Sequence, residues 1–189
     1  MTNWPANYAH FPALTTEMVD NGYALRPIHW DDRLAILNLR NAQLDVLRQV
    51  QPLSPSDQDR YFTETVLPQL DQEFPAQFMF AFLEESKLIG YGALVHVHWG
   101  DHRAEVSFLT NPDRLNPTTF AADWSAYLQL IKPVAKKLGL HKLTTETYAL
   151  RSDLIPILEA NGFAQEGVLK EHHYLNENFI DSHVHGFIL

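Results

Sequence analysis

The middle of the chain alternates apolar runs with short polar breaks, a pattern that predicts three consecutive strands. Residues 78–83 form an uninterrupted apolar run, and two longer segments with strand character follow at 88–99 and 102–110. Polar turns at 84–87 and 100–101 separate the three segments. Because tight polar turns join antiparallel neighbours, we expect an antiparallel meander here.

Apolar residues recur at helical spacing before and after this meander. Asp31 or Asp32 can cap a first helix, and Ser56 can cap a second. A longer helix is expected over residues 119–138, because its apolar residues share one side and Gly139 can end it.

The other periodic segments complete a single predicted domain. Strands are expected at residues 23–27, 142–148, 165–174 and 179–189, and a short helix at 152–161. The pattern predicts an α/β (α+β) fold with a mixed, mostly antiparallel central sheet of about seven strands and helices on both faces. Residues 1–22 show no clear period and are expected to form an N-terminal arm, with one domain over residues 23–189.

Composition and charge narrow the class of protein. The chain has 189 residues, a net charge of −9 and no cysteine. An acidic balance argues against a nucleic-acid groove, which needs a basic stripe. Without cysteine there is no disulfide, zinc–thiolate site or thiol nucleophile, which suits a cytoplasmic location. Neither a signal peptide nor an apolar run long enough to span a membrane is seen in the sequence, so no membrane association is expected.

The last third of the chain has a recognisable order of elements. A helix closes at residues 138–140, a strand follows, and a short helix ends in residues 159–163 (Glu-Ala-Asn-Gly-Phe); then come Glu166-Gly167 and a final hairpin. This order resembles the C-terminal half of the GNAT N-acetyltransferases, most closely the branch that modifies ribosomal proteins and amino sugars. The resemblance covers about residues 23–189. It implies acetyl-CoA as donor, and transfer of the acetyl group to a primary amine by direct attack in a ternary complex.

The resemblance also implies where acetyl-CoA would bind. In this family the sheet splays at its centre beside the strand that precedes the long helix, and the pantetheine arm lies in the gap. The pyrophosphate lies at the start of that helix, where backbone N–H groups and the helix dipole favour an anion. The residues that correspond to the pantetheine site are Phe108, Leu109 and Thr110. Those that correspond to the pyrophosphate site are Asn116, Thr119, Phe120 and Ala121.

Three positions depart from the family pattern. Thr119 stands where the family usually has a glycine, and it could bind phosphate or simply cap the helix. Arg151 stands where an asparagine commonly binds pantetheine; it could bind a phosphate or the ribose, or be a solvated surface residue. Leu158 replaces a tyrosine that many members use as general acid toward the departing thiolate.

Acetyl transfer needs a group that accepts the proton of the amine and a donor for the oxyanion. Glu105 is the candidate base, although it could be an ordinary strand carboxylate paired with His102 or Arg103. The backbone N–H of Phe108 or Leu109 would serve the oxyanion. Further candidates are His98 for proton transfer and Tyr148 as donor to the thiolate. Candidates for the acceptor pocket are Trp30, Arg40, His96 and His173, and the acceptor would be a peptide N-terminus, an amino sugar or a small amine.

Two other classes compete with this interpretation. The departures at Thr119, Arg151 and Leu158 would also fit a GNAT-fold protein that binds a ligand or partner without turnover. Two His-x-His pairs, at 96/98 and 183/185, each place two imidazoles on one face of a strand, as in cupin metal sites. A cupin needs an all-β barrel, and the acetyltransferase interpretation expects no metal. As an acetyltransferase, the protein is expected to be a monomer or a homodimer.

Overall fold

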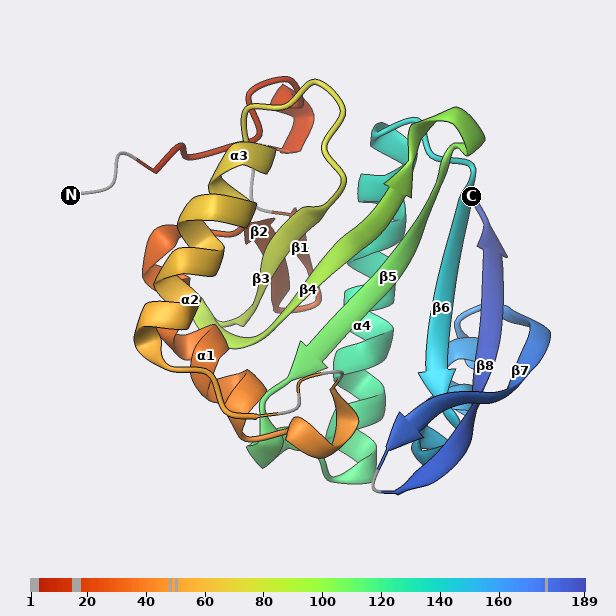
Figure 1. The fold of residues 1–189 in the computed structure, drawn as a ribbon. Coiled ribbons are helices and arrows are strands. Elements are labelled where there is room, and N and C mark those ends of the chain that lie inside the picture. The colour runs from red at the N-terminus through yellow and green to blue at the C-terminus, as the bar shows by residue number, and fades with distance from the viewer. Residues whose placement is uncertain (1–3, 15–17, 48, 50, 176) are drawn as a thin grey trace.

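The computed structural model describes residues 4–14, 18–47, 49, 51–175 and 177–189. Its centre is an eight-stranded sheet in the order β1-β2-β3-β4-β5-β6-β8-β7 (Figure 1). The strands are β1 (Met18–Asp20), β2 (Tyr23–Pro27), β3 (Phe78–Glu84), β4 (Lys87–His98), β5 (Arg103–Thr110), β6 (Lys142–Tyr148), β7 (Ala164–Leu175) and β8 (Asn178–Ile188). Among the described residues, β5 and β6 form the one parallel pair. The predicted mixed, mostly antiparallel sheet is confirmed.

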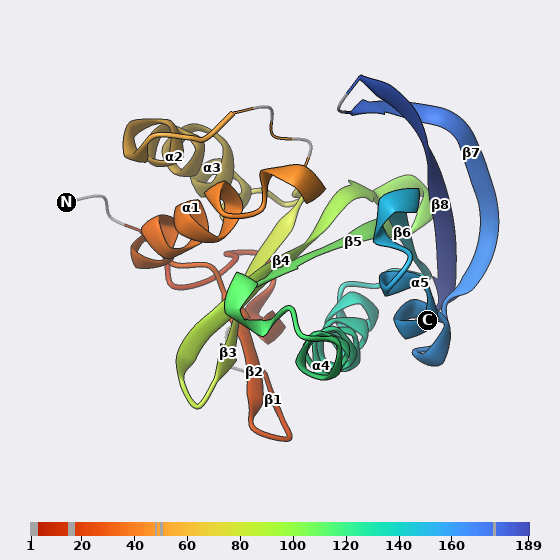
Figure 2. The same ribbon diagram turned by 90° about the horizontal axis from the view of Figure 1, so that it is seen from below.

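Helices cover both faces of this sheet, as expected. The helices are α1 (Arg33–Asn41), α2 (Pro55–Tyr61), α3 (Leu67–Gln69), α4 (Pro117–Lys137) and α5 (Leu154–Ala160). A single π-helical turn, Phe62–Val66, joins α2 to α3. Figure 2 shows α1, α2 and α3 on one side of the sheet and α4 and α5 on the other.

The helix starts differ from the predicted ones in a consistent way. Ser54, not Ser56, caps α2: its hydroxyl accepts a hydrogen bond from the Asp57 N–H at 3.2 Å, and Pro55 takes the first helical position. Proline is favoured there because that N–H has no partner within the helix. Likewise, α4 begins at Pro117, two residues earlier than predicted, with Asn116 as its cap.

Two apolar cores hold the layers together. The larger lies between the sheet and α4, where Phe108 stacks on Tyr127 with ring centroids 4.3 Å apart. The smaller lies under α1 and α2 and includes Ile36, Phe62 and Met79, all nearly inaccessible to solvent. Burial of these large side chains supplies most of the stabilisation that fixes the sheet between its two helical layers.

Part of the predicted N-terminal arm packs into this structure. Tyr8 and Leu14 are buried in the larger core. The hydroxyl of Tyr8 accepts a hydrogen bond from the Met79 N–H at 2.6 Å, and the Trp4 indole donates to the Ile28 carbonyl at 3.0 Å. Strand β1 pairs with β2 and is the strand that the sequence pattern did not predict.

The sheet opens between its two parallel strands. Pairing of β5 with β6 runs from Arg103↔Lys142 to Glu105↔Thr144 and extends over only three residue pairs. Both strands continue past that point, β5 to Thr110 and β6 to Tyr148, and they diverge (Figure 1). The predicted central splay is therefore confirmed, and Glu105 lies where it begins.

Candidate active site

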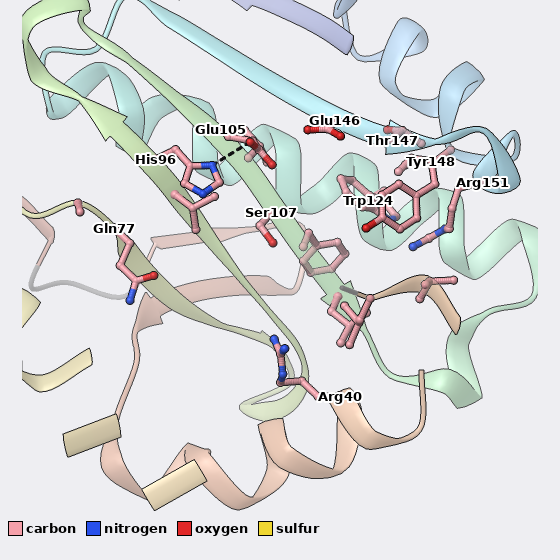
Figure 3. Close-up of a pocket in the computed structure, with 18 of the residues that line it drawn as sticks. Arg40, Gln77, His96, Glu105, Ser107, Trp124, Glu146, Thr147, Tyr148 and Arg151 are labelled. Carbon is pink, nitrogen blue, oxygen red and sulfur yellow. Dashed lines mark hydrogen bonds and ion pairs between the residues drawn. The ribbon is translucent and has the colours of Figure 1, made fainter. Parts of the chain in front are cut away.

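A cavity of about 530 Å³ occupies the gap between β5 and β6. Residues 105–109 of β5 and 146–148 of β6 line it, joined by Arg151 from the following turn and by Arg40 from α1. Figure 3 shows Glu105 toward the narrow end of the gap and Tyr148 and Arg151 toward its open end. Among the described residues, the pairing of β5 with β6 ends at Glu105, so backbone groups of residues 106–109 on that edge have no partner in β6. The Thr110 carbonyl accepts a hydrogen bond from the Gln43 side chain at 2.9 Å.

A bulge in β4 brings a histidine to the carboxylate at the start of the splay. The β4–β5 register shifts between Val95 and His98, and His96 adopts a left-handed backbone (φ 50°). Its Nδ1 lies 3.0 Å from Glu105 Oε2 (Figure 3). The Glu105 side chain keeps 24% of its surface exposed, so it reaches both the imidazole and the cavity. Bulges commonly re-aim side chains beside functional sites.

A second carboxylate, Glu146, faces the same cavity from β6. The residues of β6 alternate between buried and partly exposed, which places Glu146 on the same face as Tyr148. Its Oε1 lies 2.6 Å from His173 Nε2, and the His173 ring lies 4.6 Å from the Tyr148 ring. Sequence reasoning did not single out Glu146, although the alternation of residues 142–148 already placed it beside Tyr148.

The three residues expected to hold pantetheine have different environments. Phe108 and Leu109 line the cavity. Thr110 does not, and its hydroxyl donates to buried Asp123 at 2.8 Å. Thr110 therefore anchors the end of β5 to helix α4 through its side chain.

The start of α4 has few backbone donors left for an anion. Pro117 has no N–H, and the Thr119 N–H donates to the side-chain oxygen of Asn116 at 3.0 Å. The Phe120 N–H donates to the Asn116 carbonyl at 2.9 Å. The Arg151 guanidinium lies near this turn, 5.3 Å from the Phe120 ring, and the Arg151 side chain lines the cavity. Ala121, the fifth residue of α4, is partly exposed.

A second cavity of about 560 Å³ lies beneath α1 and α2. It shares its wall with the first cavity at Arg40, Thr65, Gln77, Val95 and Ser107. Arg40 donates to the Tyr91 hydroxyl at 2.9 Å. Burial raises the pKa of Tyr91, although Arg40 opposes this, so the hydroxyl stays protonated at neutral pH.

Trp30 and His98, like His173, lie outside the two cavities. Trp30 packs against the N-terminal segment and against Arg33, whose guanidinium lies 4.2 Å from the indole. His98 accepts a hydrogen bond from the Asp101 N–H at 3.1 Å and so caps the turn between β4 and β5.

These features together define a class of protein. A mixed sheet that opens between two parallel strands, with a cavity in the opening and a long helix after the first of them, has the architecture of acyltransferases that take their acyl group from coenzyme A. Residues 25–184 match the family described as Acetyltransferase (GNAT) domain. The chain belongs to the GNAT acetyltransferase family: it is an N-acetyltransferase with acetyl-CoA as donor, as its sequence resemblance predicted.

Solved structures with this fold include acetyltransferases for small and large acceptors. Spermidine N-acetyltransferase from Vibrio cholerae, in complex with CoA and spermine, superimposes with a TM-score of 0.76 at 18% identity, over 89% of this chain and 96% of that one. The ribosomal-protein alpha-N-acetyltransferase RimL, in complex with coenzyme A, gives 0.77 at 15% identity, over 91% and 97%. At such identities the likeness establishes the fold. No curated protein matches the chain in sequence.

The fold also decides between the competing classes. A cupin is an all-β barrel, whereas this sheet is open and carries helices on both faces. His183 and His185 lie on β8 opposite Thr147 and Thr145, and His185 is fully buried. The cupin-like interpretation of the His-x-His pairs is therefore wrong. In the part of the chain that the structure describes, no helix is both long and apolar enough to cross a bilayer.

Proposed function

We propose that the acetyl acceptor is a primary amine of a peptide N-terminus, an amino sugar or a small amine, and that it meets acetyl-CoA in a ternary complex. The observation that carries this proposal is the opening of the sheet at Glu105, with one cavity along the split and a second cavity joined to it. Two adjoining cavities suit a direct transfer, because donor and acceptor can be held side by side.

Glu105 is our candidate for the proton acceptor. The amine nitrogen attacks the thioester carbonyl, the C–N bond forms and the C–S bond breaks, and the amine proton passes to the Glu105 carboxylate. Its contact with His96 at 3.0 Å supports this role, because the imidazole can hold the carboxylate in place and relay the proton to solvent. Tyr148 would protonate the departing thiolate from the opposite wall.

The donor would lie along the split strand. The backbone N–H groups of Phe108 or Leu109 would hold the carbonyl oxygen and the pantetheine arm, since both residues line the cavity. The pyrophosphate would lie at the start of α4, at residues 116–121, next to Arg151. Because the Thr119 N–H already donates to Asn116, we assign the binding of the phosphates mainly to the charge of Arg151.

The acceptor would enter from the second cavity. Arg40 lies in both cavities and would orient the acceptor together with the Tyr91 hydroxyl. His96 and the carboxylates Glu105 and Glu146 face the point where the amine would lie. Carboxylates favour a cationic amine as it approaches, in keeping with the net charge of −9. We place the protein in the cytoplasm, as a monomer or homodimer.

The test is turnover. Acetyl-CoA mixed with a panel of peptides, amino sugars and small amines should release free CoA in an acceptor-dependent way. Glu105→Gln should lower kcat about 100-fold or more, because the loss of a general base typically has that effect. Glu85→Gln, an exposed carboxylate in the β3–β4 turn, is the matched control and should leave kcat unchanged.

Two results would contradict the proposal. Undiminished turnover in Glu105→Gln would remove this residue from the chemistry. Binding of acetyl-CoA with no release of CoA for any amine on the panel would instead favour the alternative, a GNAT-fold protein that binds without turnover.

A further inference from the structure

The β7–β8 hairpin contains an irregularity that changes the direction of two adjacent histidines. Leu169 pairs with Ser182, but the next pair is His173 with Ile180, so β7 has two extra residues in this interval. Glu171, inside the interval, has a left-handed backbone (φ 50°). Adjacent residues of a regular strand point to opposite faces. Here His172 and His173 both turn toward strand β6.

Side-chain contacts hold this bulge in place. The Asp181 carboxylate accepts a hydrogen bond from the Glu171 N–H at 2.9 Å and pairs with Lys170 at 2.7 Å. These contacts, with that to Lys170 the larger, hold the pKa of Asp181 below its ordinary value. Figure 2 shows that the hairpin bends toward the side of the sheet that carries α1, α2 and α3. The bulge therefore directs His172 and His173 at Glu146, which itself lines the cavity.

Three potential metal ligands meet at this point. Glu146 Oε1 lies 2.6 Å from His173 Nε2 and 3.9 Å from His172 Nε2, and all three atoms lie within 4.8 Å of one another. Metal–ligand bonds of about 2.0–2.2 Å at tetrahedral angles separate ligand atoms by roughly 3.3–3.6 Å. Small side-chain rotations would bring these three to that spacing. The hydrogen bond between Glu146 and His173 gives no reason for His172 to lie at the same point. A bound metal ion would give that reason, because it would use all three side chains as ligands.

We propose that Glu146, His172 and His173 form a binding site for a divalent transition metal of the zinc class. Two imidazoles and one carboxylate are a ligand set that Zn²⁺ accepts with water as the fourth ligand, and nitrogen donors disfavour Mg²⁺ and Ca²⁺. His172 keeps 46% of its side chain exposed, so an ion has access from solvent. The other two ligands are largely shielded, with 20% and 17% exposed.

The location of the site gives it a regulatory role, an inference that rests on the proposed function. Glu146 and Tyr148 line the cavity between β5 and β6, and His173 contacts Tyr148. A bound cation would neutralise the Glu146 carboxylate, repel a cationic amine and tie the hairpin to β6. Zn²⁺ therefore inhibits acetyl transfer, and removal of the metal by a chelator restores it.

Zinc binding is tested first, with no reference to activity. Calorimetric titration of the metal-free protein with Zn²⁺ should show one site per chain, and Co²⁺ should give the intense visible absorption of a four-coordinate site. His172→Ala should weaken Zn²⁺ binding about tenfold or more. His98→Ala is the matched control, because His98 is also exposed and lies 3.1 Å from a carboxylate, that of Asp101. The control should bind as the wild type does.

The outcomes separate binding from function. An absence of stoichiometric binding, or equal weakening in His172→Ala and His98→Ala, overturns the metal site. If the wild type binds Zn²⁺ but its turnover is not inhibited, or if His172→Ala is inhibited equally, the regulatory role is overturned. A protein that turns over no amine at all would refute the proposed function and would leave the calorimetric result standing.

Discussion

Arg151 is the residue that we propose to bind a cofactor phosphate, because it lines the cavity and lies 5.3 Å from the ring of Phe120 at the start of α4. We expect Arg151→Ala to raise the Kd for CoA about tenfold, the effect of losing one charge-assisted hydrogen bond. A pantetheine fragment without phosphates should bind both forms equally. Calorimetry with the two ligands measures this.

The control for that experiment is Arg103→Ala. Arg103 is a surface arginine of β5 that pairs with Asp101 at 3.4 Å and does not line the cavity. Its removal should leave the Kd for CoA unchanged. If Arg151→Ala weakens the phosphate-free fragment as much as CoA, the residue contacts the pantetheine arm or shapes the cavity, and does not bind phosphate.

Asp123 shows how a single buried charge fixes the end of β5. It is fully buried and accepts hydrogen bonds from Arg114 at 2.7 and 2.8 Å and from Thr110 at 2.8 Å. Asp123→Ala would leave the Arg114 guanidinium without its main partner. We expect a loss of about 3–5 kcal/mol in the free energy of unfolding, measured by urea denaturation.

An exposed ion pair provides the comparison for Asp123. Asp101→Ala removes the partner of Arg103 at the surface, where both side chains are about half exposed. Such pairs contribute at most about 1 kcal/mol. If both variants lost a similar free energy of unfolding, the buried hydrogen bonds of Asp123 would contribute no more to stability than an exposed ion pair does.

At the level of elements, strand β4 and helix α4 meet at a glycine. A Cβ on Gly92 would overlap the ring of Tyr127, which stacks on Phe108 and donates to the Ser107 carbonyl at 3.1 Å. Gly92→Ala should therefore cost about 1–3 kcal/mol in urea unfolding. It should also weaken CoA binding, because Phe108 lies in the split part of β5.

Gly167→Ala is the matched control for Gly92→Ala. Gly167 lies in β7, and a Cβ there would have no neighbour within 4 Å. We expect its effect on unfolding to stay within about 0.5 kcal/mol. Equal effects of the two substitutions would show that the loss of glycine in a strand, and not the contact with Tyr127, causes the change.

The sequence pattern correctly predicted those helices and strands whose bounds are marked by residues within the element or next to it. The bounds of β2 and β6 agree with the predicted residues 23–27 and 142–148. Pro27 marks the end of β2, and the β-branched threonines of residues 144–147 favour a strand. Strand β1 was missed because three residues carry too little periodicity. The start of α2 was misplaced by two residues because Ser54 and Ser56 are equally good caps until Pro55 is taken into account.

The candidate site was predictable in part for the same reason. Glu105 and Tyr148 could be found because each lies on a strand whose position was clear. The contact between Glu146 and His173 could not, because it depends on the two-residue bulge in β7, a strand that pairs with β8 and not with β6. Bulges arise from tertiary packing and leave no periodic signal in the sequence.

On the scale of the whole molecule, the split divides the sheet into two parts. Strands β1–β5 form one part and β6–β8 the other, and three residue pairs join them at the narrow end. On the face of the sheet that carries α4 and α5, helix α4 contacts the end of α5, where Lys132 donates to the Asn161 carbonyl at 2.5 Å. A ligand that fills the split would bridge both parts and oppose their separation.

Acetyl-CoA should therefore stabilise the entire chain in one cooperative transition. At a ligand concentration of about 100 times Kd, the gain is about 2.7 kcal/mol, which corresponds to a rise in Tm of roughly 5–10 °C for a chain of this size. AMP, which lacks the pantetheine arm, should give a much smaller rise because it cannot reach between β5 and β6. Differential scanning calorimetry measures both. An equal rise with AMP, or none with millimolar acetyl-CoA, would mean that the split does not bind the cofactor arm.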